Sequence, residues 1–383
     1  CGNNLGNTFG TPIIRRLHDG NWAAIFGNGL NSSTGTAGIY IMEVSSTGAI
    51  SFRFLDTGYG PSKDPLGNGN KNGIAYVSSA DLDGDHITDY VYAGDVFGNL
   101  WRFDLTSNSA ALWAAGTTPL FSTPAGQPIT TRVTVTSALA GSNPARVMVD
   151  FGTGQQLPQT LTSGAIYSSG TQSIYGIWDW NMSAWNALGS VQYSSLAAPQ
   201  TITTTKLQTQ TAVDVGGGDS STGISGYRTV TQNPICWSGS STCGTGTNNQ
   251  FGWQLALPDS GEQIIYNPTT AYGLFIVNTT IPVVNQALSC SNQPPSGYTM
   301  AIASDTGGAP NISFFANATN NFVSANGAIV SGIGLSAVGT PSFVSAETKP
   351  YMVNQTVSGI GSVTQVNAGA NGIGARLNWI KLR

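Results

Sequence analysis

The sequence is poor in charged residues. Of its 383 residues, only 14 are Lys or Arg and 18 are Asp or Glu, which makes 8% of the chain, against roughly 25% in average soluble proteins. With so few cations and a net charge of −4, the chain lacks the basic surface needed to bind nucleic acid or anionic membranes. Its apolar residues, 40% of the total, form no run long enough for a transmembrane helix.

Histidine and cysteine are also scarce. The two histidines, His18 and His86, are far apart in the sequence, which leaves little room for a histidine-based catalytic or zinc site. The four cysteines are Cys1, Cys236, Cys243 and Cys290. None forms a Cys-x-x-Cys pair, and the short spacing of Cys236 and Cys243 predicts a surface disulfide made in an oxidising compartment. Buried reduced thiols are the alternative.

The chain opens directly on Cys1, without a signal peptide. Together with the expected disulfide, this favours a fragment or processed form of a longer secreted protein.

Glycine and small polar residues take the place of charge. The chain contains 49 Gly, 40 Ser, 42 Thr and 30 Asn, residues that disfavour helix because they compete with the helical backbone or lose entropy in it. The 9 Trp, 13 Tyr and 14 Phe need burial, so the chain is expected to fold rather than stay disordered. An all-β fold is therefore predicted.

A pattern of turn, strand, turn and strand recurs along the chain. Each copy has a turn rich in Gly or Asn and a strand of alternating apolar residues, which is typical of β-hairpins. The copies lie at residues 38–54, 98–113, 175–180, 252–266 and 297–307. Such repetition without helical periodicity predicts a modified, irregular β-propeller with long inserted loops, and no domain boundary divides residues 1–383. Two β-sandwiches are the alternative.

The irregular spacing of the copies predicts long insertions at 114–131, 155–173 and 197–249. The last residues, 375–383, alternate as a strand does and are expected to close the propeller ring.

One segment concentrates acidic side chains. Six of the fifteen aspartates lie between Asp81 and Asp104, and four of them occupy positions 1, 3, 5 and 9 of one loop. Carboxylates this close repel one another unless a cation neutralises them. Calcium takes about 6–8 oxygen ligands and tolerates irregular geometry, so it is favoured over magnesium. The expected ligands are the side chains of Asp81, Asp83, Asp85 and Asp89 and the carbonyl group of Ile87.

This loop differs from an EF-hand. His86 stands at position 6, where the EF-hand has Gly, and Tyr92 stands at position 12, where it has a bidentate Glu. The flanking residues 74–77 and 90–93 alternate as strands do, so the loop is expected to join two strands. A solvated acidic turn without an ion is the alternative.

Taken together, these residues resemble the C-terminal domain of the PilY/PilC family of bacterial type IV pilus biogenesis factors and tip adhesins. The similarity rests most strongly on the aspartate loop followed by Ala-Gly-Asp-x-x-Gly-Asn-Leu-Trp-Arg-Phe-Asp. The matching stretches are Gly6–Pro12 with Trp22–Gly29, Ala80–Asp89 with Tyr92–Asp104, Phe151–Gly154, Gln172–Asp179, and Gly252–Glu262 before Asn267 and Pro268.

The resemblance implies a modified β-propeller with a calcium loop and the same set of ligands. It implies an extracellular protein of the pilus tip or bacterial cell surface, exported through the periplasm. The implied partners are minor pilins at the tip and surfaces or host-cell receptors. In the family, calcium in the loop is linked to the balance of pilus extension and retraction, and thereby to twitching motility and attachment. The family's N-terminal von Willebrand A-like region and its Arg-Gly-Asp segment do not occur in this sequence.

Two other functions stay open at this point. A quinone-binding propeller dehydrogenase also uses calcium, but it needs a general-base carboxylate, and the chain has only Glu43, Glu262 and Glu347 as glutamates. We therefore expect no enzymatic activity.

The second alternative is a carbohydrate- or matrix-binding lectin with exposed loop aromatics. The candidates are Trp178, Trp180, Trp185 and Tyr193. Aromatic residues at strand spacing more often belong to the core, as we expect for Trp101 and Phe103.

Overall fold

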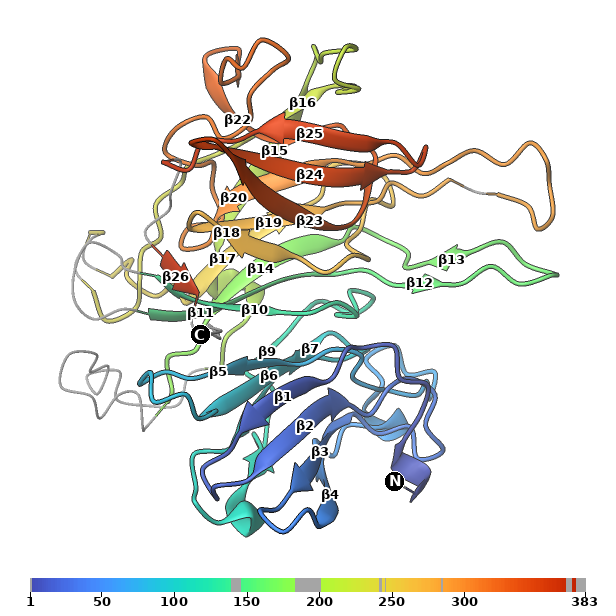
Figure 1. Cartoon of the computed structure of the whole chain (residues 1–383), viewed down its shortest axis with the longest axis vertical. Coiled ribbons are helices and arrows are strands. Elements are labelled where there is room, and N and C mark those ends of the chain that lie inside the picture. Colours follow the sequence, from blue (N-terminus) through green and yellow to red (C-terminus); the bar gives the residue numbers. More distant parts are fainter. Residues whose placement is uncertain are drawn as a thin grey trace. The chain divides into compact units, whose positions relative to one another are not determined.

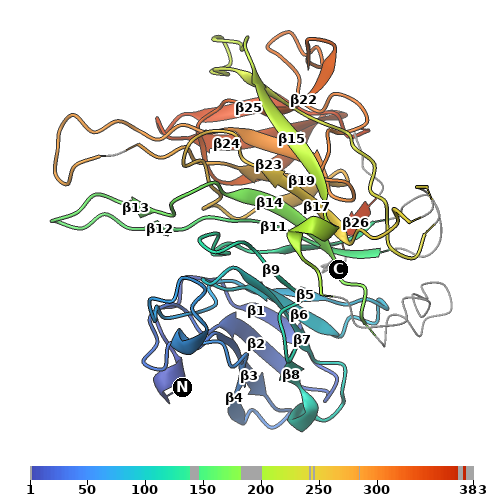
Figure 2. The ribbon, with the colours of Figure 1, turned by 180° about the vertical axis from the view of Figure 1, so that it is seen from behind.

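The structure is a computed structural model that describes residues 2–138, 146–182, 201–240, 243–244, 246–283, 285–369 and 374–376. Its regular structure is almost entirely β, as Figures 1 and 2 show from opposite sides. The short 3-10 helices are η1 (Gly2–Asn4), η2 (Pro61–Lys63), η3 (Ala110–Leu112) and η4 (Thr204–Lys206). The chain divides into two compact units: unit 1 is Cys1–Val135, Asp179–Thr204 and Arg376–Arg383, and unit 2 is Thr136–Trp178 and Thr205–Ala375.

The described part of unit 1 contains two antiparallel sheets. The first has the order β1 (Ile13–Arg16), β2 (Trp22–Gly27), β3 (Gly38–Val44) and β4 (Ile50–Asp56). The second has the order β5 (Ser78–Ala80), β6 (Tyr90–Gly94), β7 (Asn99–Asp104) and β8 (Ala114–Ala115), with β9 (Phe121–Ser122) paired to β7.

One apolar core joins the two sheets of unit 1. Alternation along β3 sends Ile39 and Ile41 into this core, where they meet Val91 of β6 and Trp101 and Phe103 of β7. All five side chains are 0% exposed, and burying a side chain of this size stabilises the fold by about 1.5–3 kcal/mol. The expectation that Trp101 and Phe103 belong to the core is confirmed.

Most residues of a long mixed sheet belong to unit 2. Its order is β18 (Thr269–Ala271), β19 (Leu274–Asn278), β20 (Thr299–Ala303), β22 (Ala328–Ile333), β16 (Tyr227–Val230), β15 (Gln208–Val215), β17 (Gly252–Ala256), β14 (Ser173–Trp178), β11 (Arg146–Gly152), β10 (Thr134–Ala138) and β26 (Gly374–Arg376). β21 (Ser324–Ala325) pairs with β22, and β15 and β17 run parallel to each other.

Two smaller groups of strands complete unit 2. A separate sheet is formed by β23 (Ala337–Ala346), β24 (Lys349–Thr356) and β25 (Gly361–Gln365). The pair β12 (Gln156–Leu157) and β13 (Ile166–Tyr167) forms a long arm that projects from the other strands of the unit (Figures 1 and 2).

The hairpin predicted at residues 38–54 is confirmed as β3 and β4. Three other details of the sequence prediction are wrong. Residues 110–112 form the 3-10 helix η3 rather than a strand, and residues 262–266 form no strand. The predicted insertion at 197–249 contains β15 and β16, which lie within the long sheet. β15 is polar, yet it buries Gln210, whose side-chain amide donates to the carbonyl oxygens of Asn233 and Thr306.

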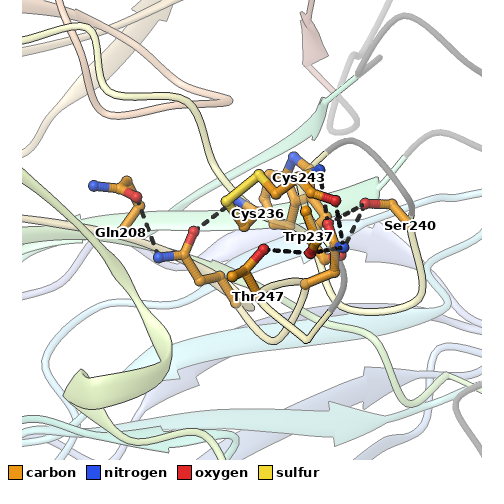
Figure 3. The surroundings of a disulfide bond; sticks show 9 residues. Gln208, Cys236, Trp237, Ser240, Cys243 and Thr247 are labelled. Atoms are coloured by element: carbon orange, nitrogen blue, oxygen red, sulfur yellow. Dashed lines mark hydrogen bonds between the residues drawn. A yellow bond between two sulfur atoms is a disulfide. The ribbon is translucent and has the colours of Figure 1, made fainter.

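The predicted disulfide between Cys236 and Cys243 is confirmed (Figure 3). Inside its loop, Trp237 is buried against Trp178, with the two ring centroids 5.8 Å apart. Cys290 is a free, exposed cysteine, and Cys1 lies outside the described residues. Of the predicted closing strand at 375–383, residues 377–383 lie outside the described part, and the single-domain organisation stays a prediction.

Candidate metal centre

The acidic loop connects two paired strands. β5 and β6 are antiparallel, with Ala80 opposite Tyr90, so the loop begins and ends at adjacent points of one sheet. The amide of Asp89 donates to the carbonyl oxygen of Ala80 at 2.9 Å and closes the loop at its base. The expectation that the loop joins two strands is therefore confirmed, but the preceding strand is Ser78–Ala80 and not residues 74–77.

The next turn, between β6 and β7, is fixed by the buried carboxylate of Asp95. It accepts hydrogen bonds from the indole of Trp101 at 2.8 Å and from the side-chain amides of Asn72 and Asn99, both at 2.9 Å. Burial raises the pKa of Asp95, and these donors oppose the rise. The conspicuous Gly-Asp-x-x-Gly-Asn-Leu-Trp motif thus builds a rigid hairpin beside the loop.

Within the loop, three of the four aspartates converge. One carboxylate oxygen each of Asp81, Asp83 and Asp89 lies within 4.8 Å of the other two. Oxygens that share one calcium ion at about 2.3–2.6 Å cannot lie more than about 5 Å apart. The separations of the three carboxylates are therefore compatible with one such ion.

Asp85 and Ile87 are placed differently. The Asp85 carboxylate accepts the Ile87 amide at 2.8 Å, and Asp85 is not part of the convergent group. Asp83 similarly accepts the Asp85 amide at 3.1 Å, so the loop is a series of local turns that its own aspartates hold. The roles of the Asp85 side chain and the Ile87 carbonyl group as ligands stay predictions.

Two residues let the loop turn sharply around Asp81. Asp81 accepts the amides of Gly84 at 2.8 Å and His86 at 2.9 Å. Gly84 has a φ of 82° and His86 a φ of 69°, both in the left-handed region that costs most side chains energy. His86 thus adopts a glycine-like conformation at the position where an EF-hand has Gly.

Asp89 is the buried member of the group, at 8% exposure. Burial raises the pKa of its carboxyl group, hydrogen bonds from the Leu82 amide and from His18 oppose the rise, and the charge of Asp83 adds to it. The Leu82 amide donates at 2.7 Å, and His18 Nε2 lies 3.0 Å from Asp89 Oδ1. A cation beside this carboxylate offsets the cost of burying its charge.

Comparison with known proteins places the chain. A family model described as the PilY1 beta-propeller domain matches residues 2–213. This chain belongs to that family. The family is the one that the aspartate loop and its flanking motifs indicate in the sequence, and the predicted all-β propeller fold is confirmed with it.

PilY1 relatives extend the similarity over the remaining residues. The chain is 30% identical over 303 residues to the type IV pilus biogenesis factor PilY1 of Pseudomonas aeruginosa (strain PAO1), covering 72% of this chain and 24% of that protein. It is 29% identical over 390 residues to a PilY1 homolog of Xylella fastidiosa, covering 99% of this chain and 26% of that protein. The chain thus spans about a quarter of the length of these relatives.

A solved structure agrees with the fold. The crystal structure of the Pseudomonas aeruginosa PilY1 C-terminal domain superposes with a TM-score of 0.70 at 25% identity, covering 96% of this chain and 73% of that chain. These relatives are named as pilus biogenesis factors and not as enzymes. In the described part of the chain, no helix has the length and apolar character to cross a membrane.

Sequence reasoning missed two long-range features. His18 contacts Asp89 although 71 residues separate them, and no local pattern predicts that contact. In unit 2, fully buried Arg228 pairs with Glu262 at 2.7 Å, Asp214 at 2.6 Å and Asp259 at 3.0 Å. Glu262, one of the three glutamates weighed as a catalytic base, is thus bound in a structural ion cluster.

The aromatic candidates for sugar binding are buried where the structure describes them. Trp178 is 0% and Trp180 is 6% exposed, which leaves no ring face free to stack on a sugar. Trp185 and Tyr193 lie outside the described residues.

Proposed function

We propose that this chain is a calcium-binding propeller segment of a type IV pilus biogenesis factor. The observation that carries the proposal is the convergence of the Asp81, Asp83 and Asp89 carboxylates on one point of the β5–β6 loop. Membership of the PilY1 family supports the link to the pilus.

Calcium is the proposed ion because the site offers hard oxygen ligands in an irregular loop. Asp81, Asp83 and Asp89 supply the initial carboxylates. Asp85 and the Ile87 carbonyl group complete the ligand set after a small change of the loop. The ion links the ends of β5 and β6 through the aspartate side chains, including Asp89, which His18 contacts. Because the ion binds the folded state, its binding stabilises the loop.

The proposed role lies at the pilus tip, outside the cell, after export through the periplasm. There the segment acts with minor pilins and with surfaces or host-cell receptors. Its calcium-loaded form supports the balance of pilus extension and retraction, twitching motility and attachment. Two of the four aromatic candidates for sugar binding are buried, so no specific observation favours the lectin alternative.

A test in the producing bacterium separates the calcium site from general charge effects. Strains carry Asp83→Asn, Asp89→Asn, or the control Glu347→Gln, which removes one charge from an exposed turn of unit 2. We expect fewer surface pili and smaller twitching zones in the two loop variants, and wild-type behaviour in the control. Normal piliation and twitching in both loop variants, with the protein present at its usual level, contradicts the proposal.

A further inference from the structure

The motif Gly-Asn-Leu-Trp-Arg-Phe-Asp on β7 contains one cation, Arg102, that the calcium site does not use. Successive side chains of a strand point to opposite faces. Since Trp101 and Phe103 lie in the core of unit 1, Arg102 lies on the other face of β7. There Arg102 Nη1 donates to Asp179 Oδ1 at 2.6 Å, and the Asp179 side chain is 0% exposed. A buried carboxylate thus fixes the position of the guanidinium group.

Most of the guanidinium group is left for a ligand. Arginine has five N–H donors, and in the described part of the chain the bond to Asp179 is the one hydrogen bond that Arg102 makes to a carboxylate. The other oxygen of Asp179 accepts the hydroxyl group of Tyr92 at 2.7 Å. The Arg102 side chain is 25% exposed, and it lines a cavity of about 260 Å³.

An interruption in the neighbouring strand creates this cavity. β8 pairs with the end of β7 and β9 with its beginning. Between them, the Gly116 amide donates to the carbonyl oxygen of Arg102 at 2.9 Å, and the Leu120 amide donates to that of Leu100 at 2.8 Å. Residues 117–119 take no part in the pairing. Like a β-bulge, they leave the sheet and open space beside a side chain of the paired strand.

Neutral donors surround Arg102 in this cavity. They are the hydroxyl groups of Thr117, Thr118 and Thr201 and the side-chain amide of Asn181. All four residues are exposed, and the structure gives their side chains no hydrogen-bond partner among the described residues. An ionised carboxylate only accepts hydrogen bonds, and it matches the fork of a guanidinium group in a bidentate pair. The donor set therefore suits a carboxylate.

A second cavity of about 430 Å³ continues the first, because both are lined by Thr118, Pro119, Leu120 and Thr201. We call the two together the β8–β9 groove; all its lining residues belong to unit 1. Their volumes together lie in the range of about 300–1,000 Å³ that is typical of ligand sites. The walls of the second cavity are residues 118–124 and 201–204.

The shape of the groove favours an extended peptide over a sugar. Among the described strands, β9 pairs with β7 alone, so its other edge is open to a further strand. Extended peptides bind such edges through backbone hydrogen bonds. A sugar needs an open aromatic face, but Trp180, which lines the first cavity, is 6% exposed.

We propose that the β8–β9 groove binds an extended peptide whose carboxylate pairs with Arg102. The carboxylate is either the chain end of the peptide or an acidic side chain, and the groove recognises the same group in both. Asp179 does not prevent this pairing: in unit 2 of the same chain, the guanidinium group of Arg228 pairs with three carboxylates. This inference does not depend on the calcium site.

Affinity selection from defined peptide pools tests the proposal. The 383-residue chain, in buffer with a calcium chelator, is mixed with random N-acetylated peptides of Gly, Ala, Ser, Thr, Val and Gln. One pool ends in a free carboxylate, one ends in an amide, and one ends in an amide but contains a central Asp. Mass spectrometry of the bound fraction is expected to show enrichment of the first or the third pool over the amide pool. The enriched pool tells chain end from side chain.

Two variants locate the binding of an enriched peptide. Arg102→Lys keeps a positive charge beside Asp179 but loses the planar fork, and it is expected to weaken binding about tenfold or more. Arg53→Lys is its matched control, because Arg53 lies on β4 in unit 1, over the ring of Trp113 and outside the groove. The control is expected to bind as wild type does.

The second variant fills the groove without touching Arg102. Thr118→Trp is expected to abolish binding and to leave the melting temperature unchanged, because Thr118 is exposed where the two cavities join. Thr340→Trp, at an exposed residue of β23 in unit 2, is expected to change neither.

Three results overturn the proposal. Retention of no pool, or equal retention of all three, means that the groove does not recognise a carboxylate. Wild-type affinity in Arg102→Lys means that Arg102 is not its partner. Wild-type affinity in Thr118→Trp means that the peptide binds elsewhere. Because the buffer holds no free calcium, each result is separate from the outcome for the proposed function.

Discussion

His18 Nε2 lies 3.0 Å from Asp89 Oδ1, so a residue from the turn after β1 holds the last carboxylate of the acidic loop. One carboxylate oxygen of Asp89 lies within 4.8 Å of carboxylate oxygens of Asp81 and Asp83. Residues that orient ligands in this way commonly change metal affinity about 10–100-fold when removed.

We expect His18→Ala to weaken calcium binding by about tenfold, because Asp89 loses the contact that orients it. Isothermal titration calorimetry measures the change. His86→Asn is the matched control: His86 is exposed, 4.0 Å from Asp81, and Asn tolerates its φ of 69°. Equal affinities for wild type and His18→Ala contradict a positioning role.

Gly84 and His86 both have left-handed backbone conformations, so substitutions at these two residues are expected to have opposite effects on the free energy of unfolding. Gly84→Ala is expected to lower the free energy of unfolding by about 1–2 kcal/mol, because an added Cβ is strained at a φ of 82°. No atom lies within 4 Å of that Cβ, so the loss reports backbone strain alone. His86→Gly is expected to raise the free energy of unfolding by about 0.5 kcal/mol. Chemical denaturation without calcium distinguishes the two, and a stabilising Gly84→Ala speaks against this loop conformation.

The disulfide joins Cys236 and Cys243, which are seven residues apart in the sequence, and closes a loop around the buried Trp237. Replacing both Cys236 and Cys243 by Ser is expected to lower the free energy of unfolding by about 2–3 kcal/mol, since the unfolded chain gains freedom. Thermal or chemical unfolding checks this change. Cys290→Ser, at an exposed free thiol, is expected to have no effect; a stable double variant shows that the Trp237 packing alone holds the loop.

The buried carboxyl group of Asp150 on β11 makes the free energy of unfolding depend on pH. Burial raises its pKa well above the ordinary value; hydrogen bonds from Ser304 and Thr136 oppose the rise, and the charge of Asp305 adds to it. A raised pKa means that this group's stabilising contribution is complete below about pH 3.9, its unfolded pKa, and is lost as the pH rises through the folded pKa. Asp150→Asn is therefore expected to raise the free energy of unfolding at pH 7 by about 1 kcal/mol or more.

Chemical denaturation between pH 4 and pH 8 tests this prediction. The free energy of unfolding of Asp150→Asn is expected to exceed that of wild type by an amount that grows as the pH rises. Asp219→Asn is the control. Hydrogen bonds from Ser221 and from the Ala318 amide lower the pKa of Asp219, so its contribution is complete above its unfolded pKa of about 3.9 and is lost only at lower pH. Its difference from wild type is therefore expected to stay constant between pH 4 and pH 8. A difference for Asp150→Asn that is constant with pH contradicts the raised pKa.

Local patterns in the sequence predict the parts of the site that are local in the chain. The loop between β5 and β6, its turns and the strands around it follow from aspartate spacing and period-two alternation within about fifteen residues. β15 escaped prediction because its buried positions include polar Gln210, whose partners lie on distant segments. A strand whose buried residues are hydrogen-bonded rather than apolar does not give the alternation that identifies strands.

The long-range contacts could not be predicted for a related reason. His18 and Asp89, or Arg228 and Glu262, come together only when strands far apart in sequence pair in the fold. Nothing in the residues near either partner requires the other.

The central claim is that the β5–β6 loop holds one calcium ion, and anomalous diffraction from crystals grown with calcium tests it most directly. We predict one anomalous peak with oxygens of Asp81, Asp83 and Asp89 at about 2.3–2.6 Å, joined by Asp85 and the Ile87 carbonyl oxygen. An anomalous map without a peak there, in crystals equilibrated with millimolar calcium, contradicts the claim.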